Sequence, residues 1–264
     1  MDGNFEILDA EEMEENIVDW WKSLNRLSKS KISEYFHPMN LLNYLYSKLE
    51  ELKEYLPMII ALRTKGITER HWQILSRMFN IQLDPSTVSV RSLLSHKLYE
   101  ADKLSNIKGV SDIAVKEYAI QTTLENLENE IKAAEFTTLK YKDTNTHILR
   151  GTDELVSQFE EFSIKISALR ANQLSKNFNS RVSKVEKDIK IVEDVLEEWN
   201  KAQKSWIYLE SIFQSEDISK QMPQESQSFQ TLDSFYRQSM KSIVFDPSVI
   251  RISKRDGLYF QLMK

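Results

Sequence analysis

The longest regular pattern in the chain is a stripe of apolar residues between Phe178 and Phe213. This segment contains neither Gly nor Pro, and the stripe repeats alternately every four and three residues. Such spacing predicts one long α-helix, of about 35 residues within positions 172–213, whose apolar side faces other helices. At about 1.5 Å per residue it would be roughly 54 Å long. The stripe consists of Phe178, Val182, Val185, Ile189, Val192, Leu196, Trp199, Gln203 and Trp206.

Shorter helical patterns fill most of the remaining chain. We expect breaks at His37-Pro38 and at Pro57, because proline disfavours the helical conformation in the residue before it and is favoured in a first helical turn. Caps such as Thr68 mark further starts. The predicted segments are 11–29, 39–54, 57–63, a helix from Thr68, 90–99, a helix from 111 or 112 to 134, 152–171 and a helix from Pro223.

One segment departs from the helical period. Two β-branched and aromatic runs, 136–141 and 146–150, flank Asp143-Thr-Asn145 and predict a β-hairpin near 136–150. The predicted fold is therefore mainly α, an elongated rod of consecutive antiparallel helix bundles. We expect an N-terminal sub-bundle over 1–110 and a second sub-bundle, with the hairpin and the long helix, over 111–264.

Composition supports this interpretation. Only 5 Gly and 5 Pro among 264 residues leave little room for the turns of a sheet protein. The chain has no Cys, which removes thiolate and Cys-based metal chemistry. We expect no membrane span, since no run of about 18 apolar residues occurs, and no signal peptide, since residues 1–15 are acidic rather than basic and then apolar. The net charge of −5 argues against a nucleic-acid partner.

The sequence lacks the residue groups that catalysis requires. Its glycines are isolated from one another, so no phosphate-binding loop is present. None of the 4 histidines has a Glu or His partner at metal-ligand spacing. We therefore expect no catalytic, cofactor-binding or metal site, and the chain should not be an enzyme. His71 is interpreted as a packed or capping residue, with a ligand or base as the less favoured alternative.

Two features of the long helix allow alternatives. Gln203 is a polar member of the stripe between Trp199 and Trp206. It either fixes register by hydrogen bonding, which we favour, or marks where the stripe reaches the surface. Charge is also segregated, basic over 176–190 and acidic over 193–198. This favours a solvated face with paired charges, and the alternative is a surface for an oppositely charged partner.

Two stretches of the chain resemble dynein heavy chains. The first has Leu56-Pro57 followed by 62–72, which ends in Arg70-His71-Trp72. The second is more specific, because no generic coiled coil demands its residues in that order. Its matching residues are Trp199, Gln203, Trp206, Tyr208, Leu209, Glu210, Phe213, Asp217-Ile218, Met222-Pro223-Gln-Glu225 and Phe229. The resemblance covers 50–245 well and the first forty residues weakly.

The resembled segment is the N-terminal part of the linker, the helical arm between the tail and the AAA+ ring of a dynein heavy chain. The stretch 141–149 is similar to the hairpin of axonemal, particularly inner-arm, heavy chains. One departure is Glu135-Phe136, which stands where those chains have a Trp.

The resemblance implies a non-catalytic lever arm, which passes the ATP-driven change of the ring to the tail in minus-end-directed motility. Its partners would be the AAA+ ring of the same chain, the tail, other dynein subunits and, indirectly, the microtubule. It implies no nucleic-acid or membrane partner. ATP and Mg would bind only to the ring, so this segment would carry no cofactor.

The implied location is cytoplasmic, in the cytoskeleton of a ciliary or flagellar axoneme. Hinges are expected at 214–222 and at Asp246-Pro247. The alternative function is a helical cytoskeletal or tethering module unrelated to dynein.

Overall fold

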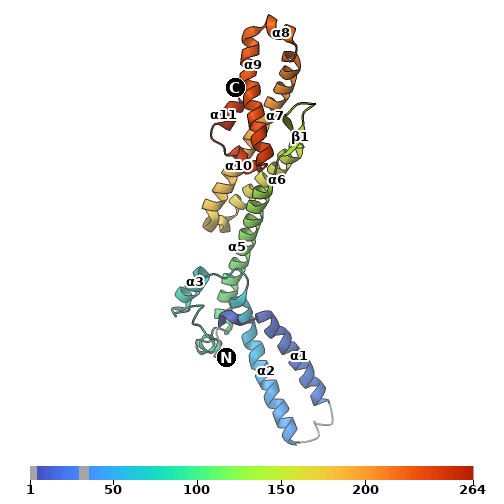
Figure 1. Cartoon of the computed structure of the whole chain (residues 1–264). Helices are drawn as coiled ribbons and strands as arrows, with labels where there is room; N and C mark the ends of the chain where they lie inside the picture. Colours follow the sequence, from blue (N-terminus) through green and yellow to red (C-terminus); the bar gives the residue numbers. More distant parts are fainter. Residues whose placement is uncertain (1–4, 30–35, 264) are drawn as a thin grey trace. The chain divides into compact units, whose positions relative to one another are not determined.

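The computed structural model describes residues 5–29 and 36–263, and this part of the chain is mainly α-helical, as the sequence predicts (Figure 1). The chain divides into two compact units, Met1–Ala119 and Ile120–Lys264. The division falls within helix α5 (Ala101–Ala133). The apolar cores of the described residues each lie within one unit, and each unit is described by itself below.

The first unit opens with a pair of helices, α1 (Ala10–Ser28) and α2 (Phe36–Arg63). Trp21 of α1 lies under the ammonium of Lys53, and Asn25 accepts a hydrogen bond from Tyr46. Later residues of α1 thus meet earlier residues of α2, so the two helices are antiparallel. Their shared core consists of Ile17, Leu24, Leu42, Leu49 and Leu56.

A second core of this unit joins the end of α2 to the elements that follow. These are the short 3-10 helix η1 (Phe5–Ile7), α3 (Glu69–Phe79), α4 (Val90–Ser95) and the first turns of α5. Gly66, at φ +97°, connects α2 to α3, and a Cβ there would lie only 2.5 Å from the carbonyl oxygen of Ala114 on α5. A side chain would therefore collide with α5. The central residues of this core are Phe5, Met58, Ile59, Leu62, Trp72, Leu75, Leu93, Leu98 and Ile107.

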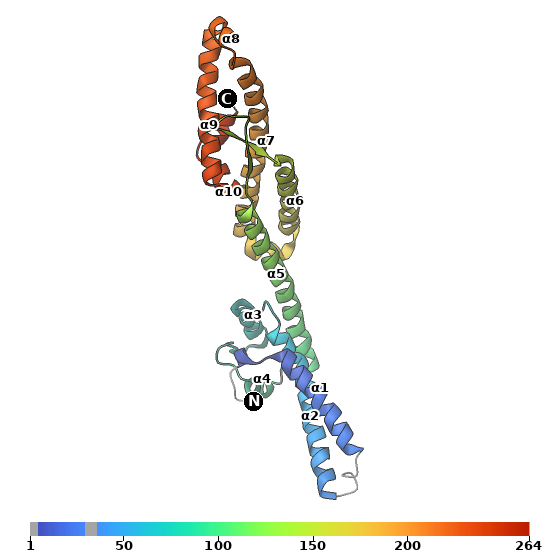
Figure 2. The same ribbon diagram turned by 45° about the vertical axis from the view of Figure 1, so that its right-hand side comes forward.

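The second unit is built around helix α7 (Asn179–Phe213), the long helix that the stripe predicts. Helix α7 packs against several other helices of the unit, and α8 connects it to α9 (Figures 1 and 2). These elements are α6 (Thr152–Ala171), α8 (Glu216–Gln221), α9 (Pro223–Phe245), α10 (Val249–Ser253) and α11 (Leu258–Leu262).

Burial along α7 confirms the predicted seam. The apolar residues of the predicted stripe from Val182 to Trp206 are all buried. Phe178 and Gln203, which complete the stripe, are of intermediate exposure. Removing such side chains from water contributes about 1.5–3 kcal/mol each. A helix of this length is thus held by packing along most of its length rather than by its intrinsic propensity.

The predicted hairpin is also confirmed. Strands β1 (Thr137–Lys140) and β2 (His147–Arg150) pair antiparallel, with Thr137 opposite Arg150. The segment before β1 meets the connection between α9 and α10, because the N–H of Phe136 donates to the carbonyl of Pro247 at 2.8 Å.

The predicted break at Pro57 is wrong, and two helices start earlier than predicted. Helix α2 continues through Pro57, although proline in a helix interior costs about 3 kcal/mol. Its neighbours Leu56, Met58 and Ile59 are buried in the two cores of the unit, and this packing outweighs the loss. Helix α2 also starts at Phe36, before His37-Pro38. A proline in the first turn costs little, because the N–H groups of that turn have no partner within the helix.

Helix α5 begins at Ala101 rather than near Asp112. Gly109 lies inside it and costs about 1 kcal/mol relative to Ala, while Ile107 and Val110 on either side are buried.

Two other predicted bounds need correction. Residues 173–178 form a 3-10 helix, η3 (Gln173–Phe178), which Asn172 caps by accepting from the N–H of Leu174, so the α-helix starts at Asn179. Helix α4 ends at Ser95 rather than Tyr99, because Lys97 adopts a left-handed conformation with φ 53°. In the described residues, none of the helices combines the length and apolar character needed to cross a membrane.

Candidate functional site

The resembling stretch of α7 directs one face toward the hairpin and α9. Trp199, Gln203, Trp206 and Glu210 follow one another by four, three and four residues, which places them on a single side of a helix. Trp206 is fully buried and Glu210 is only 4% exposed. The predicted stripe therefore continues past Trp206 to a buried carboxylate.

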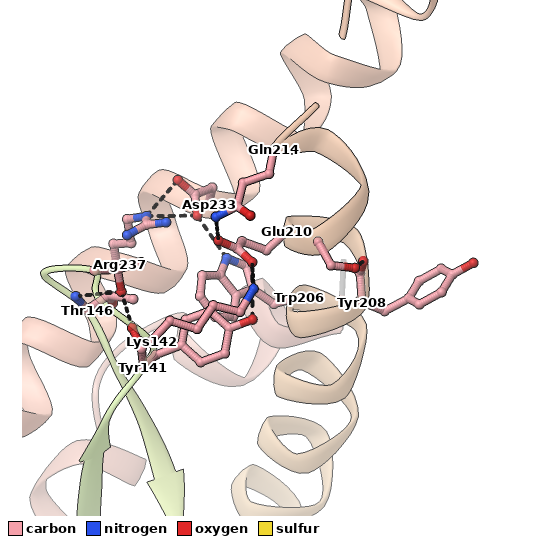
Figure 3. A network of polar contacts seen from close by, with 11 residues as sticks. Tyr141, Lys142, Thr146, Trp206, Tyr208, Glu210, Gln214, Asp233 and Arg237 are labelled. Carbon is pink, nitrogen blue, oxygen red and sulfur yellow. Dashed lines mark hydrogen bonds and ion pairs between the residues drawn. The ribbon is translucent and has the colours of Figure 1, made fainter. Parts of the chain in front are cut away.

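Trp206 connects three elements of the second unit. Its ring stacks on Tyr236 of α9, with centroids 4.2 Å apart, and meets Tyr141 edge-on at 5.0 Å. Its indole N–H donates to Asp233 at 2.9 Å, and Asp233 also accepts from the guanidinium of Arg237 (Figure 3). Burial raises the pKa of Tyr236, so its phenol stays neutral and can donate. The indole is thus satisfied both by packing and by its hydrogen bond.

Glu210 is fully engaged by its neighbours. One carboxylate oxygen accepts from the phenol of Tyr141 at 3.1 Å and from the ammonium of Lys142 at 2.9 Å. The other accepts from the amide of Gln214 at 3.0 Å (Figure 3). Hydrogen bonds to Tyr141 and Glu210 hold the pKa of Lys142 above its ordinary value. We call Glu210, Tyr141, Lys142 and Gln214 the Glu210 cluster; it fastens the end of the hairpin to the last turns of α7.

Gln203 makes the hydrogen bonds that the register-fixing interpretation requires. Its Oε1 accepts from the backbone N–H of Leu149 at 2.7 Å, and its Nε2 donates to the carbonyl of Leu149 at 3.0 Å. Tyr236 also donates to Oε1, at 2.9 Å. The side-chain amide therefore links α7 to β2 and α9.

The other residues of this stretch lie outside that face. Tyr208 is 67% exposed and points away from the Glu210 cluster (Figure 3). Leu209 is half-buried, and Phe213 stacks on Phe229 with centroids 5.2 Å apart. Pro223 is exposed and opens α9. The structure thus brings together only part of the resembling residues.

His71 and Trp72 belong to the first unit. Nδ1 of His71 accepts from the backbone N–H of Thr68 at 3.1 Å, which caps α3. Its Nε2 lies 3.4 Å from the carboxylate of Glu117, and Arg70 forms an ion pair with the same carboxylate. Burial, and next the charge of Arg70, lower the pKa of His71, whereas Glu117 acts in the opposite direction. We call His71, Arg70 and Glu117 the Glu117 cluster.

Trp72 contributes packing beside this cluster. Its ring meets Phe5 edge-on at 5.9 Å in the second core of the unit. Its neighbour His71 is 1% exposed, in accord with the packed or capping interpretation.

Sequence reasoning missed several members of these clusters. Glu117, Lys142 and the indole contact of Asp233 carry no local signal, because the partners Arg70, Glu210 and Trp206 are distant in sequence. The burial of Glu210 had a signal, since it extends the spacing of the stripe by four residues from Trp206. Among residues 5–29 and 36–263, no group of His, Cys, Asp or Glu side chains could hold a metal ion.

The segregated charges of α7 are partly paired along the helix. Lys190 bonds Asp194 at 2.8 Å, and Lys201 bonds Glu197 at 2.7 Å, each four residues apart. Such pairs favour the solvated-face interpretation, and each stabilises an exposed helix by only about 0.3–0.5 kcal/mol.

Comparison with known proteins gives a consistent result. The family described as "Dynein heavy chain, N-terminal region 2" matches residues 1–264. The chain is 33% identical to dynein axonemal heavy chain 1 of Homo sapiens over 246 residues. These residues make up 93% of this chain and 6% of that protein. The chain is 32% identical over 246 residues to the Mus musculus protein of the same name, again covering 93% of this chain and 6% of the relative. Dynein axonemal heavy chain 3 of Homo sapiens is 28% identical over 251 residues, 95% of this chain and 6% of the relative. The chain thus spans about 6% of the length of these relatives.

Proposed function

Because this chain belongs to the dynein heavy chain family, matched along its whole length by the N-terminal region 2, we propose that it is a mechanical linker segment. In this role it transmits the ATP-driven conformational change of the AAA+ ring to the tail during minus-end-directed movement on microtubules. Family membership excludes the alternative of a helical module unrelated to dynein.

The observation that carries the proposal is helix α7. It runs without interruption from Asn179 to Phe213 and packs against α6, α9, α10 and α11. Packed interiors have low compressibility and transmit strain. The aromatic residues Trp199 and Trp206 and the two hydrogen-bonding side chains Gln203 and Glu210 add lateral connections to the hairpin and α9. A helix supported in this way resists bending, as a lever requires.

The segment is non-catalytic in this proposal. Both oxygens of Glu210 are occupied by hydrogen bonds, and His71 is buried with both ring nitrogens facing protein groups. Nucleotide and Mg belong to the ring of the full-length heavy chain. The partners are that ring, the tail and other dynein subunits, with the microtubule reached indirectly and neither nucleic acid nor membrane involved.

We place the hinge of the segment at 214–222. Helix α8, within these residues, has no buried residue, so few packed contacts oppose its movement. The second candidate, Asp246-Pro247, is held more firmly, because Arg251 donates to Asp246 at 2.9 Å and Pro247 accepts from Phe136. The relatives are named axonemal, and we place this heavy chain in the cytoskeleton of a cilium or flagellum accordingly.

The test uses the full-length heavy chain. Four glycines inserted after Val195 interrupt α7, and the matched control carries the same insertion after Thr144 in the hairpin turn. We expect the α7 insertion to lower microtubule gliding velocity severely while ATPase activity of the ring persists, and the control to glide normally. Equal gliding by both variants would contradict a lever role.

A second measurement addresses the absence of catalysis. Calorimetric titration of the 264-residue chain with Mg-ATP should show no binding. A micromolar site would contradict the assignment of nucleotide to the ring alone.

A further inference from the structure

The two outer edges of the β-hairpin differ in how their backbone groups are satisfied. On the β2 side, Gln203 bonds both the N–H of Leu149, at 2.7 Å, and its carbonyl, at 3.0 Å. The amide of Gln203 therefore occupies the position that a peptide group of a third strand would take. Gln203 therefore closes this edge at Leu149.

The outer edge of β1 is open. The N–H of Tyr141 donates to the carbonyl of Thr146 at 3.0 Å, which makes these two a hydrogen-bonded pair. Bonded and non-bonded pairs alternate along an antiparallel ladder, so Thr138 and Lys140 direct their N–H and C=O groups away from β2. Within residues 5–29 and 36–263, no hydrogen bond reaches these outward groups.

Pairing along this edge has already begun next to β1. Phe136, two residues before Thr138, directs its N–H the same way and donates to Pro247 at 2.8 Å, and Glu135 bridges to Ser248. The partner residues Pro247 and Ser248 come shortly after the end of α9. Phe245, the last residue of α9, is 92% exposed. The open edge therefore follows directly after a paired one, and the partner residue Pro247 lies two positions after the exposed ring of Phe245.

We propose that the outer edge of β1 binds an extended peptide segment of a partner, which adds to the hairpin as a third strand. The side chains of β1 define its chemistry. Lys140 has no ion pair in the described part of the chain, and Leu139, on the opposite face, is 48% exposed. The incoming strand therefore carries carboxylates alternating with apolar side chains, because successive residues of a strand point to opposite faces. This inference is independent of the mechanical role.

The same side chains argue against a second copy of this chain as the occupant. Lysine on a short edge strand is a common device against edge-to-edge pairing of identical strands. Two copies of β1 would bring two lysine side chains to one small ladder, where like charges destabilise the pairing. An acidic strand meets the same lysine favourably.

The test uses a defined probe, a fluorescein-labelled, acetylated eight-residue peptide of alternating Val and Glu. Its binding to the chain is measured by fluorescence polarisation. The matched control peptide is N-methylated at the residues whose N–H groups would face β1, which removes donors without changing side chains. We expect saturable binding of the Val-Glu peptide and at least about tenfold weaker binding of the methylated peptide, the loss expected for one or two hydrogen bonds.

Two variants locate the site. Thr138→Pro removes an outward N–H without removing a bond to β2, and it should weaken binding about tenfold. Lys140→Glu should lower affinity for the Val-Glu peptide and raise it for a Val-Lys peptide. The methylated and unmethylated Val-Glu peptides are compared first on the unmodified chain, so the test does not depend on whether a variant folds.

Three results would overturn the proposal. They are absence of saturable binding, equal binding of the methylated and unmethylated peptides, and self-association of the chain that Thr138→Pro abolishes in analytical ultracentrifugation. The last result would assign the edge to a second copy.

Discussion

Each compact unit contains a buried carboxylate that fastens two segments distant in sequence. Glu117 on α5 is 6% exposed and meets α3 through Arg70 and His71. Glu210 on α7 is 4% exposed and meets the hairpin through Tyr141 and Lys142. In both clusters the cation is exposed, so its charge remains solvated while the carboxylate is enclosed.

The two clusters differ in the side chain that accompanies the carboxylate and the cation. In the first unit it is the imidazole of His71, a side-chain type whose ordinary pKa lies near neutral pH. In the second unit it is a phenol and an amide, and the cluster contains no histidine. The stability contributed by the Glu117 cluster and by the Glu210 cluster should therefore change differently as pH falls. The comparison teaches that the chemistry of the partners, rather than the burial of the carboxylate, sets the pH response.

The largest effect that separates the units should come from Trp206→Ala. Removing a fully buried Trp creates a cavity and leaves Asp233 without the indole donor, which should cost about 3–5 kcal/mol of unfolding free energy. Hydrogen exchange should show faster amide exchange in α6, α7 and α9. Trp72→Ala is the matched control, and its effect should be confined to the first unit. Faster exchange throughout the chain in both variants would show that the units do not unfold separately.

Truncation of the buried carboxylates should have the next largest effect. Glu210→Ala leaves Tyr141 and Gln214 without their acceptor and should cost about 1–3 kcal/mol in chemical denaturation. Glu117→Ala should have a similar cost, since it removes the ion partner of Arg70. The comparison between clusters would fail if one substitution were neutral and the other severe.

A pH series should give a smaller and selective effect. The pKa of His71 is lowered from its ordinary value of 6.5, so the folded state favours the neutral ring. The unfolded chain then binds more protons below this pH, and the contribution of His71 is present above about pH 6.5 and lost as pH falls.

The measurement is the thermal midpoint of each unit at pH 7.5 and 5.5. Acid should destabilise the first unit more in the unmodified chain than in His71→Gln. Arg70 and Glu117, the charged groups facing the ring, remain in both proteins. An identical pH response of the two proteins would remove His71 from the explanation.

The smallest effect should come from Tyr208→Ala. This ring lies on the same helix as Trp206 but is 67% exposed, so unfolding free energy should change by less than about 0.5 kcal/mol. Urea unfolding of both variants side by side tests whether one face of α7 carries the packing. A loss near that of Trp206→Ala would show that Tyr208 contacts more of the protein than its exposure indicates.

Much of the fold could be predicted because its signals are local. The alternation of four and three residues locates the seam of α7, and β-branched runs around Asp143-Thr-Asn145 locate the hairpin. Helix bounds are harder to predict from sequence. Pro57 and Gly109 each disfavour a helix intrinsically, while long-range packing keeps both within helices. That packing energy is not visible in a short window of sequence.

The candidate sites show the same limit. Periodicity places Gln203 and Glu210 on the packed face, but it does not identify Leu149 or Tyr141 as their partners. Those contacts span 54 and 69 positions of the chain. Tyr208 belongs to the resembling stretch and yet lies outside the packed face, because a sequence motif lists neighbours along the chain rather than in space.

The amide of Gln203 also restricts how the hairpin can change in evolution. Inserting one residue into β2 would reverse the direction of the N–H and C=O groups beside Gln203, leaving donor and acceptor without partners. Length variation among homologous hairpins should therefore accumulate in the turn between Tyr141 and Thr146. Homologues that lack the hairpin should have no requirement for glutamine at this position.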